Sequence, residues 1–297
     1  MGKRQARVMY TPTRSIQDLK PDSAGTAMAN NALLEKLLAG NTVLGFANMY
    51  PASGIIEGAA KDFDFAWIDS QHGEHDYRTV LAACQACSGV NVAALVRVPG
   101  QEPALLGIYA DLAPLGMMIP MVNTAEEAQC VVDALYFPPQ GSRSFGGRRI
   151  IDLYGRDMPT EFHMIVVAQI ETLKAVENAD AIINTDGIDM LFFGPDDMRI
   201  CMGLPMNTPI LENDQLRDAA QRMGAAARQA GKFAGTVAFD PQHQQFFLEA
   251  GYQAIVVAGD IACLRTMAAK SLEDVKQVVA GITPTEREFK FPQSYYG

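Results

Sequence analysis

Two apolar runs in this sequence end in side chains that could hold a metal ion. One spans residues 166–171 and ends in Gln169 and Glu171, and the other spans residues 192–197 and ends in Asp197. Such runs are typical of buried parallel strands, and neighbouring strands lie roughly 4.8 Å apart. Two carboxylates at adjacent strand ends could therefore share one hard divalent cation. The alternative is that Glu171 and Asp197 only cap the helices that follow them.

Three more side chains could act on a 2-oxo acid bound at such a cation. The metal would acidify the methyl group beside the keto carbon, and Arg97 would stabilise the developing enolate oxygen. His72 is the candidate base, because an unperturbed imidazole pKa of about 6.5 suits proton transfer near neutrality. Asp69, three residues earlier, could orient its ring. Taken singly, each could instead be a loop hydrogen-bonder, an ion-pair partner or a helix cap.

The elements that must position these residues are strands that alternate with helices. Eight strands are expected, at residues 42–49, 65–69, 92–98, 116–122, 164–171, 188–194, 233–239 and 254–259. This alternation predicts an α/β fold, a closed (β/α)8 TIM barrel, with a doubly wound open sheet as the alternative. In such barrels the catalytic groups project from the C-terminal strand ends. Asp69, Arg97, Gln169, Glu171 and Asp197 all fall at or near these ends.

Composition narrows the class of protein. The chain has 297 residues, and 34 acidic against 24 basic residues give a net charge of -10. This charge argues against nucleic acid or an anionic membrane as a partner, and no apolar run reaches the roughly 18–20 residues that span a bilayer. Five cysteines scattered through apolar segments indicate reduced thiols rather than a disulfide framework. We therefore expect a cytoplasmic protein that acts on small molecules.

Other chemistries receive less support from the sequence. A Schiff-base aldolase needs a lysine inside the barrel, but Lys174 falls in the turn after one strand and Lys232 at the start of another. A zinc hydrolase is disfavoured because the four histidines form no HExxH motif, and His75 is interpreted as a helix-start residue. No GxGxxG follows the first strand and no GxxxxGK occurs, which disfavours nucleotide binding.

Six motifs occur in order along the chain. They are residues 67–73 (WIDSQHG), 95–99 (LVRVP), 119–124 (IPMVNT), 136–139 (YFPP), 169–172 (QIET) and 194–197 (GPDD). Together they resemble the HpcH/HpaI metal-dependent pyruvate aldolases of the phosphoenolpyruvate/pyruvate barrel superfamily, in particular 4-hydroxy-2-oxoheptanedioate aldolase-like and macrophomate synthase-like members. The resemblance covers about residues 33 to 280.

The resemblance implies a metal centre and a catalytic base. Glu171 and Asp197 match the family's ligands of a divalent metal, which would be Mg2+ or Mn2+, with Co2+ or Zn2+ as alternatives. Arg97 matches the arginine that stabilises the enolate and contacts the substrate, and His72 with Asp69 matches the base and its partner.

The resemblance also implies how pyruvate is held. Gln169 matches an active-site amide, and the segment Gly194, Pro195, Asp196 and Asp197 matches the one whose backbone amides hold the pyruvate carboxylate. The aldehyde side is less defined. The basic, glycine-rich loop at residues 143–149 could receive an acceptor's carboxylate or phosphate, or could simply be a solvated loop.

The implied activity is that of a class II lyase. It would cleave 4-hydroxy-2-oxo acids to pyruvate and an aldehyde, and catalyse the reverse aldol addition, through a metal-bound pyruvate enolate. An oxaloacetate decarboxylase or a macrophomate synthase-like enzyme would use the same enolate. An acyl-CoA lyase and a non-catalytic binding barrel are the remaining alternatives.

The resemblance implies a homohexamer, a trimer of dimers that exchange their last helix, here within about residues 261–280. We expect a flexible N-terminal arm at residues 1–28, one barrel domain at residues 29–282, and a C-terminal tail at residues 283–297. Two departures from the family pattern are Gln71, where many members have Glu, and Ala113-Pro114, where members usually have Gly-Ala.

Overall fold

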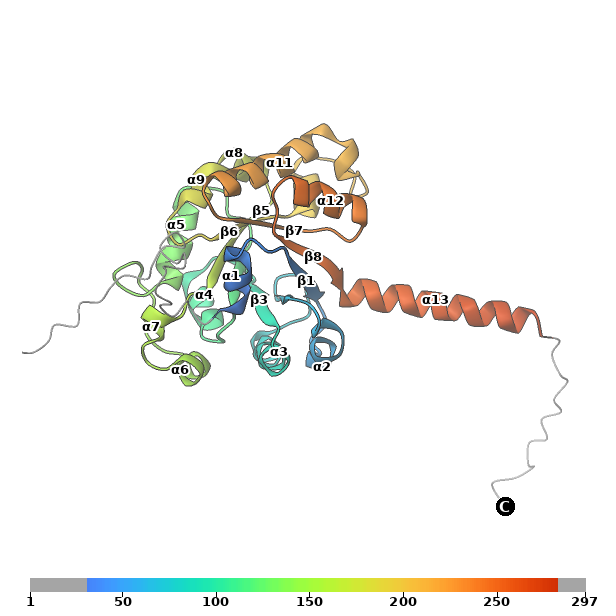
Figure 1. The fold of residues 1–297 in the computed structure, drawn as a ribbon, viewed down its shortest axis with the longest axis horizontal. Helices are drawn as coiled ribbons and strands as arrows, with labels where there is room; N and C mark the ends of the chain where they lie inside the picture. The colour runs from blue at the N-terminus through green and yellow to red at the C-terminus, as the bar shows by residue number, and fades with distance from the viewer. Residues whose placement is uncertain (1–30, 283–297) are drawn as a thin grey trace, which may run out of the picture. The chain divides into compact units, whose positions relative to one another are not determined.

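The computed structural model describes residues 31–282, apart from the side chains of residues 160 and 161. Eight parallel strands pair in chain order, and β1 pairs with β8, so the sheet closes into a barrel (Figure 1). Their bounds are β1 Val43–Asn48, β2 Phe65–Asp69, β3 Ala93–Arg97, β4 Gly116–Ile119, β5 Ile165–Ile170, β6 Met190–Phe193, β7 Phe233–Val237 and β8 Ala254–Gly259. The predicted (β/α)8 barrel is confirmed, and the open-sheet alternative is wrong.

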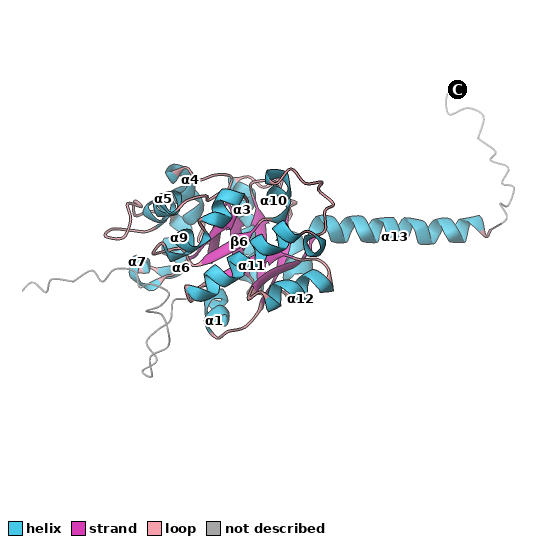
Figure 2. Cartoon of the chain, turned by 90° about the horizontal axis from the view of Figure 1, so that it is seen from above, coloured by secondary structure: helices cyan, strands magenta, loops and turns pink. Residues whose placement is uncertain are grey.

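The helices before α13 lie around the strands (Figure 2). Their bounds are α1 Ala32–Leu38, α2 Ser53–Ile55, the π-helical turn η2 Ile56–Ala60, α3 Tyr77–Val90, α4 Pro103–Ala110, α5 Ala125–Leu135, α6 Arg148–Tyr154, α7 Met158–Glu161, α8 Leu173–Glu177, α9 Ala179–Asn184, α10 Pro195–Cys201, the 3-10 turn η3 Ile210–Glu212, α11 Asp214–Gln229, α12 Pro241–Glu249 and α13 Asp260–Ala280. In the part of the chain that the structure describes, none of these helices has the length and apolar character needed to cross a membrane.

Side-chain oxygens fix where several of these helices begin. The Asp76 carboxylate accepts the backbone N–H of Thr79, and the Thr79 hydroxyl accepts the N–H of Asp76, which forms a capping box at the start of α3. At the starts of α5 and α11, the side chains of Thr124 and Asn213 each accept one backbone N–H. These caps fix the points at which three of the loops that precede helices end.

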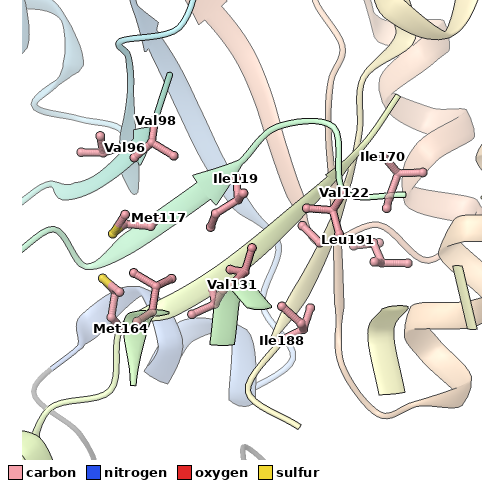
Figure 3. Packing of buried hydrophobic residues seen from close by; sticks show 14 of the residues in the cluster. Val96, Val98, Met117, Ile119, Val122, Val131, Met164, Ile170, Ile188 and Leu191 are labelled. Atoms are coloured by element: carbon pink, nitrogen blue, oxygen red, sulfur yellow. The ribbon is translucent and has the colours of Figure 1, made fainter. Parts of the chain in front are cut away.

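Alternation along each strand divides the apolar side chains into two layers. One layer fills the barrel interior and includes Trp67, Leu95, Val167 and Phe192. The other lies between the strands and the helices, and Figure 3 shows part of it around β4, β5 and β6. Side chains alternate with a period of two, so a side chain two positions further along the same strand also faces the barrel axis.

The chain divides into two compact units, Met1–Asp260 and Ile261–Gly297. The barrel lies in the first unit, and all of α13 after its first residue lies in the second. The whole predicted arm (residues 1–28) and the whole predicted tail (residues 283–297) lie outside the described residues. The predicted domain boundaries therefore stay predictions.

The barrel interior leaves no room for a side chain on β1 at Gly45. A Cβ atom there would lie 2.3 Å from Cζ of Phe65, whose ring is fully buried. We expect Gly45→Ala to lower the free energy of unfolding by about 1–3 kcal/mol, since overpacking forces buried side chains out of their rotamers. Gly54→Ala is the matched control, because a Cβ at residue 54 meets no atom within 4 Å. Thermal unfolding at one fixed protein concentration compares the two, and equal midpoints would contradict this packing.

Candidate active site

A buried ion pair joins the C-terminal ends of β2 and β3. Asp69 and Arg97 are register partners, and the guanidinium donates two hydrogen bonds to the carboxylate, from Nε at 2.8 Å and from a terminal nitrogen at 2.5 Å. Their side chains are 0% and 7% exposed. Burial acts to raise the pKa of Asp69, but the hydrogen bonds and charge of Arg97 outweigh it and hold that pKa below its ordinary value.

Trp67 forms the floor beneath this pair. The guanidinium carbon of Arg97 lies 4.7 Å from the centre of the indole ring, which itself packs against Phe192 at 5.6 Å between ring centres. A guanidinium over an aromatic face is attracted by the ring quadrupole. This role of Trp67 was not predicted from the sequence, although its position two residues before Asp69, on the same strand face, is a signal for it.

Asp69 also holds the loop that carries His72. Its Oδ1 atom accepts the backbone N–H groups of Gln71 at 3.0 Å and His72 at 3.3 Å. Within residues 31–282, the Asp69 carboxylate contacts His72 through this backbone amide, whereas the predicted contact was with the imidazole ring. The His72 side chain is exposed at the rim. Its role as the base stays a prediction.

Glu171 is fixed by two hydrogen bonds just beyond the end of β5. The Gln169 amide donates to its Oε1 at 2.7 Å, and the backbone N–H of Met121 donates to its Oε2 at 2.9 Å. Gly194 lies against both side chains, because a Cβ at this residue would be 2.7 Å from Cγ of Glu171 and 3.3 Å from the Gln169 amide nitrogen. Glycine at this position is therefore a requirement of the site.

Met121 reaches Glu171 by an unusual backbone conformation. Its φ of 57° lies in the left-handed region, which is rare for residues other than glycine. Its carbonyl accepts hydrogen bonds from the side-chain amides of Gln101 at 3.0 Å and Asn123 at 2.6 Å. These bonds hold the peptide so that its N–H points at the carboxylate. No sequence signal marks a left-handed methionine, so this conformation could not be predicted from the sequence.

Asp197 lies in the first turn of α10, close enough for its charge to act on Glu171. Burial, together with the charge of Asp197, raises the pKa of Glu171 to about 7 against the hydrogen bond from Met121. The Oε1 atom of Gln169 is buried and has no hydrogen-bond partner within residues 31–282. Two crowded carboxylates and a spare amide oxygen are a donor set that fits a hard divalent cation and an oxygen-bearing substrate.

The other predicted binding residues lie beside this pair of carboxylates. Pro195 is the first residue of α10, and the exposed Asp196 side chain accepts a hydrogen bond from Arg199 at 2.8 Å. The Asp196 carboxylate is thus engaged away from Glu171. No group of three or more His, Cys, Asp or Glu side chains in the described part of the chain could hold a metal by itself. A cation between Glu171 and Asp197 would need further oxygen ligands from water or substrate.

The basic loop at residues 143–149 makes its contacts away from these residues. Arg143 pairs with Asp111 at 2.7 Å, and Arg149 donates to the carbonyls of Leu112 and Cys84. Asp111 and Leu112 precede β4, so they lie at the N-terminal end of the barrel. The suggestion that this loop receives the acceptor therefore finds no support within the chain, because these arginines bind structural partners at the opposite rim.

Comparison with known proteins identifies the family of this chain. The sequence model of the family described as HpcH/HpaI aldolase/citrate lyase matches residues 46–266. The chain belongs to this family. HpcH/HpaI proteins with assigned activities are among its similar relatives, and the predicted family and the predicted class of aldehyde-lyase are confirmed.

Three HpcH/HpaI relatives illustrate the similarity. The 4-hydroxy-2-oxovalerate aldolase of Rhodococcus jostii is 37% identical over 212 residues, which cover 68% of this chain and 80% of the relative. The hydroxypyruvate/pyruvate aldolase of Rhizorhabdus wittichii is 31% identical over 226 residues, covering 73% and 87%. The crystal structure of macrophomate synthase superposes with a TM-score of 0.75 at 27% identity, covering 84% of this chain and 90% of that one.

The buried ion pair predicts a pH-dependent stability. Asp69→Asn leaves a buried arginine without its counter-charge, so we expect a loss of about 3–5 kcal/mol of stability near pH 7. The folded-state pKa of Asp69 lies below its ordinary value of 3.8, so the pair's contribution is complete above that pH and is lost as the pH falls through the folded-state pKa. The difference in melting temperature between wild type and variant should therefore shrink in acid.

Asp152→Asn is the control for this prediction. It breaks an ion pair with Arg148 in which both side chains are more than half exposed, at 78% and 61%. Exposed pairs contribute little, so this variant should melt with the wild type at every pH. A difference in melting temperature between wild type and Asp69→Asn that stays constant from pH 7 to pH 3 would contradict the charge assigned to Asp69.

Proposed function

We propose that this aldolase cleaves 4-hydroxy-2-oxo acids to pyruvate and an aldehyde, and catalyses the reverse addition. The observation that carries the proposal is the arrangement of Glu171 at one rim of the barrel. It is held by Gln169 and by the Met121 N–H, lies near Asp197, and shares the rim with the Asp69–Arg97 pair. The name of the Rhodococcus jostii relative, a 4-hydroxy-2-oxovalerate aldolase, supports the substrate class.

Glu171 and Asp197 would hold the divalent cation, which we propose is Mg2+ or Mn2+. The donor set is made of oxygen atoms, and one of the two carboxylates has its pKa raised by burial and by the charge of the other. Hard cations prefer such ligands and keep open positions for water and substrate. When bound, the cation would withdraw electrons from the keto group of a 2-oxo acid and so ease enolate formation.

The residues around the carboxylates divide the remaining work. Arg97 would stabilise the negative charge that develops on oxygen when the enolate forms, because its guanidinium is rigidly held by Asp69 and Trp67. The backbone N–H groups of Asp196 and Asp197, at the start of α10, would bind the substrate carboxylate. Gln169 would use its unpaired Oε1 to bind a donor group of the substrate or of a bound water.

His72 would move the protons. In cleavage its imidazole takes the proton of the C4 hydroxyl, the C3–C4 bond breaks, and the aldehyde leaves with its new carbonyl. The electron pair of that bond remains on C3 as the enolate of pyruvate, and a proton returned to C3 completes the product. The rim position and exposed side chain of His72 support this role.

A second candidate function uses the same enolate. Macrophomate synthase shares the fold at 27% identity, and its structure covers most of this chain. Loss of carbon dioxide from oxaloacetate would give the pyruvate enolate without any aldehyde. The decarboxylase and synthase activities thus differ from the aldolase activity in what forms or captures the enolate, and not in the residues that stabilise it.

Exchange of the pyruvate methyl protons in heavy water tests the shared step. We expect NMR to show loss of the methyl signal only with Mg2+ or Mn2+, and Glu171→Gln to slow it by at least about 100-fold, the size typical of losing one charge-stabilising group. Glu177→Gln, at an exposed residue after the same strand, should exchange at the wild-type rate. Exchange that survives chelation, or that survives in Glu171→Gln, would overturn the metal site.

We also propose that the enzyme is a homohexamer, a trimer of dimers that exchange α13. The helix has 21 residues, and its larger apolar side chains recur at helical spacing along one stripe. They include Leu264, Met267, Leu272, Val275 and Val279. A stripe of this length suits burial against a second copy of the chain, which is the occupant that the family resemblance implies.

Light scattering after size-exclusion chromatography tests the assembly. Leu272→Glu places a charge in the stripe and should reduce the mass from that of a hexamer toward that of a monomer. Lys270→Gln changes a residue two positions earlier on the polar side of α13 and should leave the mass unchanged. A wild-type monomer, or a Leu272→Glu variant that stays hexameric, would contradict the exchange.

A further inference from the structure

Three buried polar side chains near the rim take no part in the chemistry described above. They are Asn48 at the end of β1, His75 in the loop after β2, and Asp260 just after β8, and they are 0%, 7% and 1% exposed. His75 Nε2 lies 3.1 Å from Asn48 Oδ1, and Asn48 Nδ2 lies 3.1 Å from Asp260 Oδ2. The three therefore form a continuous hydrogen-bonded chain between the ends of three segments far apart in the sequence.

The direction of each hydrogen bond follows from Asp260. Its carboxylate accepts the backbone N–H groups of Met49 at 2.8 Å and Tyr50 at 2.9 Å as well as the Asn48 amide. A carboxylate only accepts, so Asn48 must turn its NH2 group to Asp260 and its carbonyl oxygen to His75. His75 must then carry a proton on Nε2 and donate it. Burial also lowers the pKa of His75, which keeps the ring neutral.

The chain of bonds ends on the loop that carries His72. This loop, residues 70–76, is fixed at its start by Asp69 and at its end by the capping box of α3. Between these points the Glu74 N–H donates to the Met49 carbonyl at 2.9 Å. Gly73 is packed so closely that a Cβ would lie 2.2 Å from the Asp69 carbonyl oxygen and 2.9 Å from that of Met49.

We propose that His75 is a positioning residue for the reaction. Through Asn48 and Asp260 it holds residues 70–76 against the segment 48–50, and so sets where the exposed imidazole of His72 lies relative to the rim. Among the predicted catalytic side chains, that of His72 makes no hydrogen bond within residues 31–282. Its position therefore depends on the backbone of its loop. The proposal rests on the proposed role of His72 as the base.

The test compares two replacements of His75. His75→Leu keeps the bulk and removes the donor, whereas His75→Gln can place an amide N–H near the position of Nε2. We expect His75→Leu to lower the kcat of methyl-proton exchange by about 10- to 100-fold, as displacement of a catalytic group by about 1 Å does. The KM for pyruvate and the affinity for Mn2+ should stay within about twofold, because Glu171 follows β5 and Asp197 lies in α10, and neither belongs to the loop at residues 70–76. His75→Gln should restore most of the kcat.

A second readout does not depend on catalysis. Amide hydrogen–deuterium exchange, measured by mass spectrometry, should become faster in residues 70–76 of His75→Leu and stay unchanged in α3. His243→Leu is the control, since this half-buried histidine bonds Asp240 at the start of α12. If His75→Leu fails to fold, Asn48→Ser removes the next bond in the chain and should give the same pattern.

The outcomes separate this proposal from the proposed function. Faster amide exchange in residues 70–76 of His75→Leu would support the hold of His75 on this loop. If the wild type then showed no methyl-proton exchange, the role of His72 as the base would be overturned. Wild-type kcat and unchanged amide exchange in His75→Leu would overturn the positioning role. Equal losses in His75→Leu and His75→Gln would also overturn it, because the donor would then not be the part of His75 that acts.

Discussion

The rest of the site depends on the need to pair a buried charge. Arg97 is buried at the rim, where an unpaired guanidinium would be strongly destabilising, and Asp69 on the next strand supplies the counter-charge. The same carboxylate then has lone pairs left for the amides of Gln71 and His72. One ion pair thus joins two strands, fixes the guanidinium over Trp67, and starts the loop that carries the proposed base.

Glu171 shows the opposite solution to the same problem. It is nearly fully buried, and the charge that acts on its pKa most, that of Asp197, has the same sign, so the hydrogen bond from Met121 only partly offsets the effect of burial. Asp69 and Glu171 therefore differ in kind. Asp69 is satisfied within the protein, whereas Glu171 is prepared for a positive partner.

The sequence predicted the barrel well because its strands are short apolar runs whose ends coincide with polar residues. The strands at residues 65–69 and 254–259 were predicted with the observed bounds, and the others lie within the predicted ranges. Strand period also placed Gln169 on the interior face, because alternation needs no knowledge of other segments. Local patterns were therefore enough for the fold and for the rim on which the site residues lie.

Contacts between distant segments could not be predicted in the same way. The hydrogen bond from Asn48 to Asp260 spans 212 residues of sequence, and nothing in the local pattern of His75 distinguishes a buried donor from a helix-start residue. Ala113, where the family resemblance implies glycine, has a φ of 55°, in the left-handed region that favours glycine. The partners of Arg143 and Arg149 likewise depend on tertiary packing that composition does not reveal.

The left-handed backbone of Met121 has a consequence for engineering the enzyme. Its N–H, and not its side chain, supports Glu171, and the side chain is 41% exposed at the rim. Residue 121 is therefore open to substitution while the carboxylate stays in place, provided that the replacements favour Gly, Asn and Asp and avoid β-branched residues. Gly194, which packs against the same Glu171 side chain, allows no such freedom, so the same rim contains one position that can be redesigned and one that cannot.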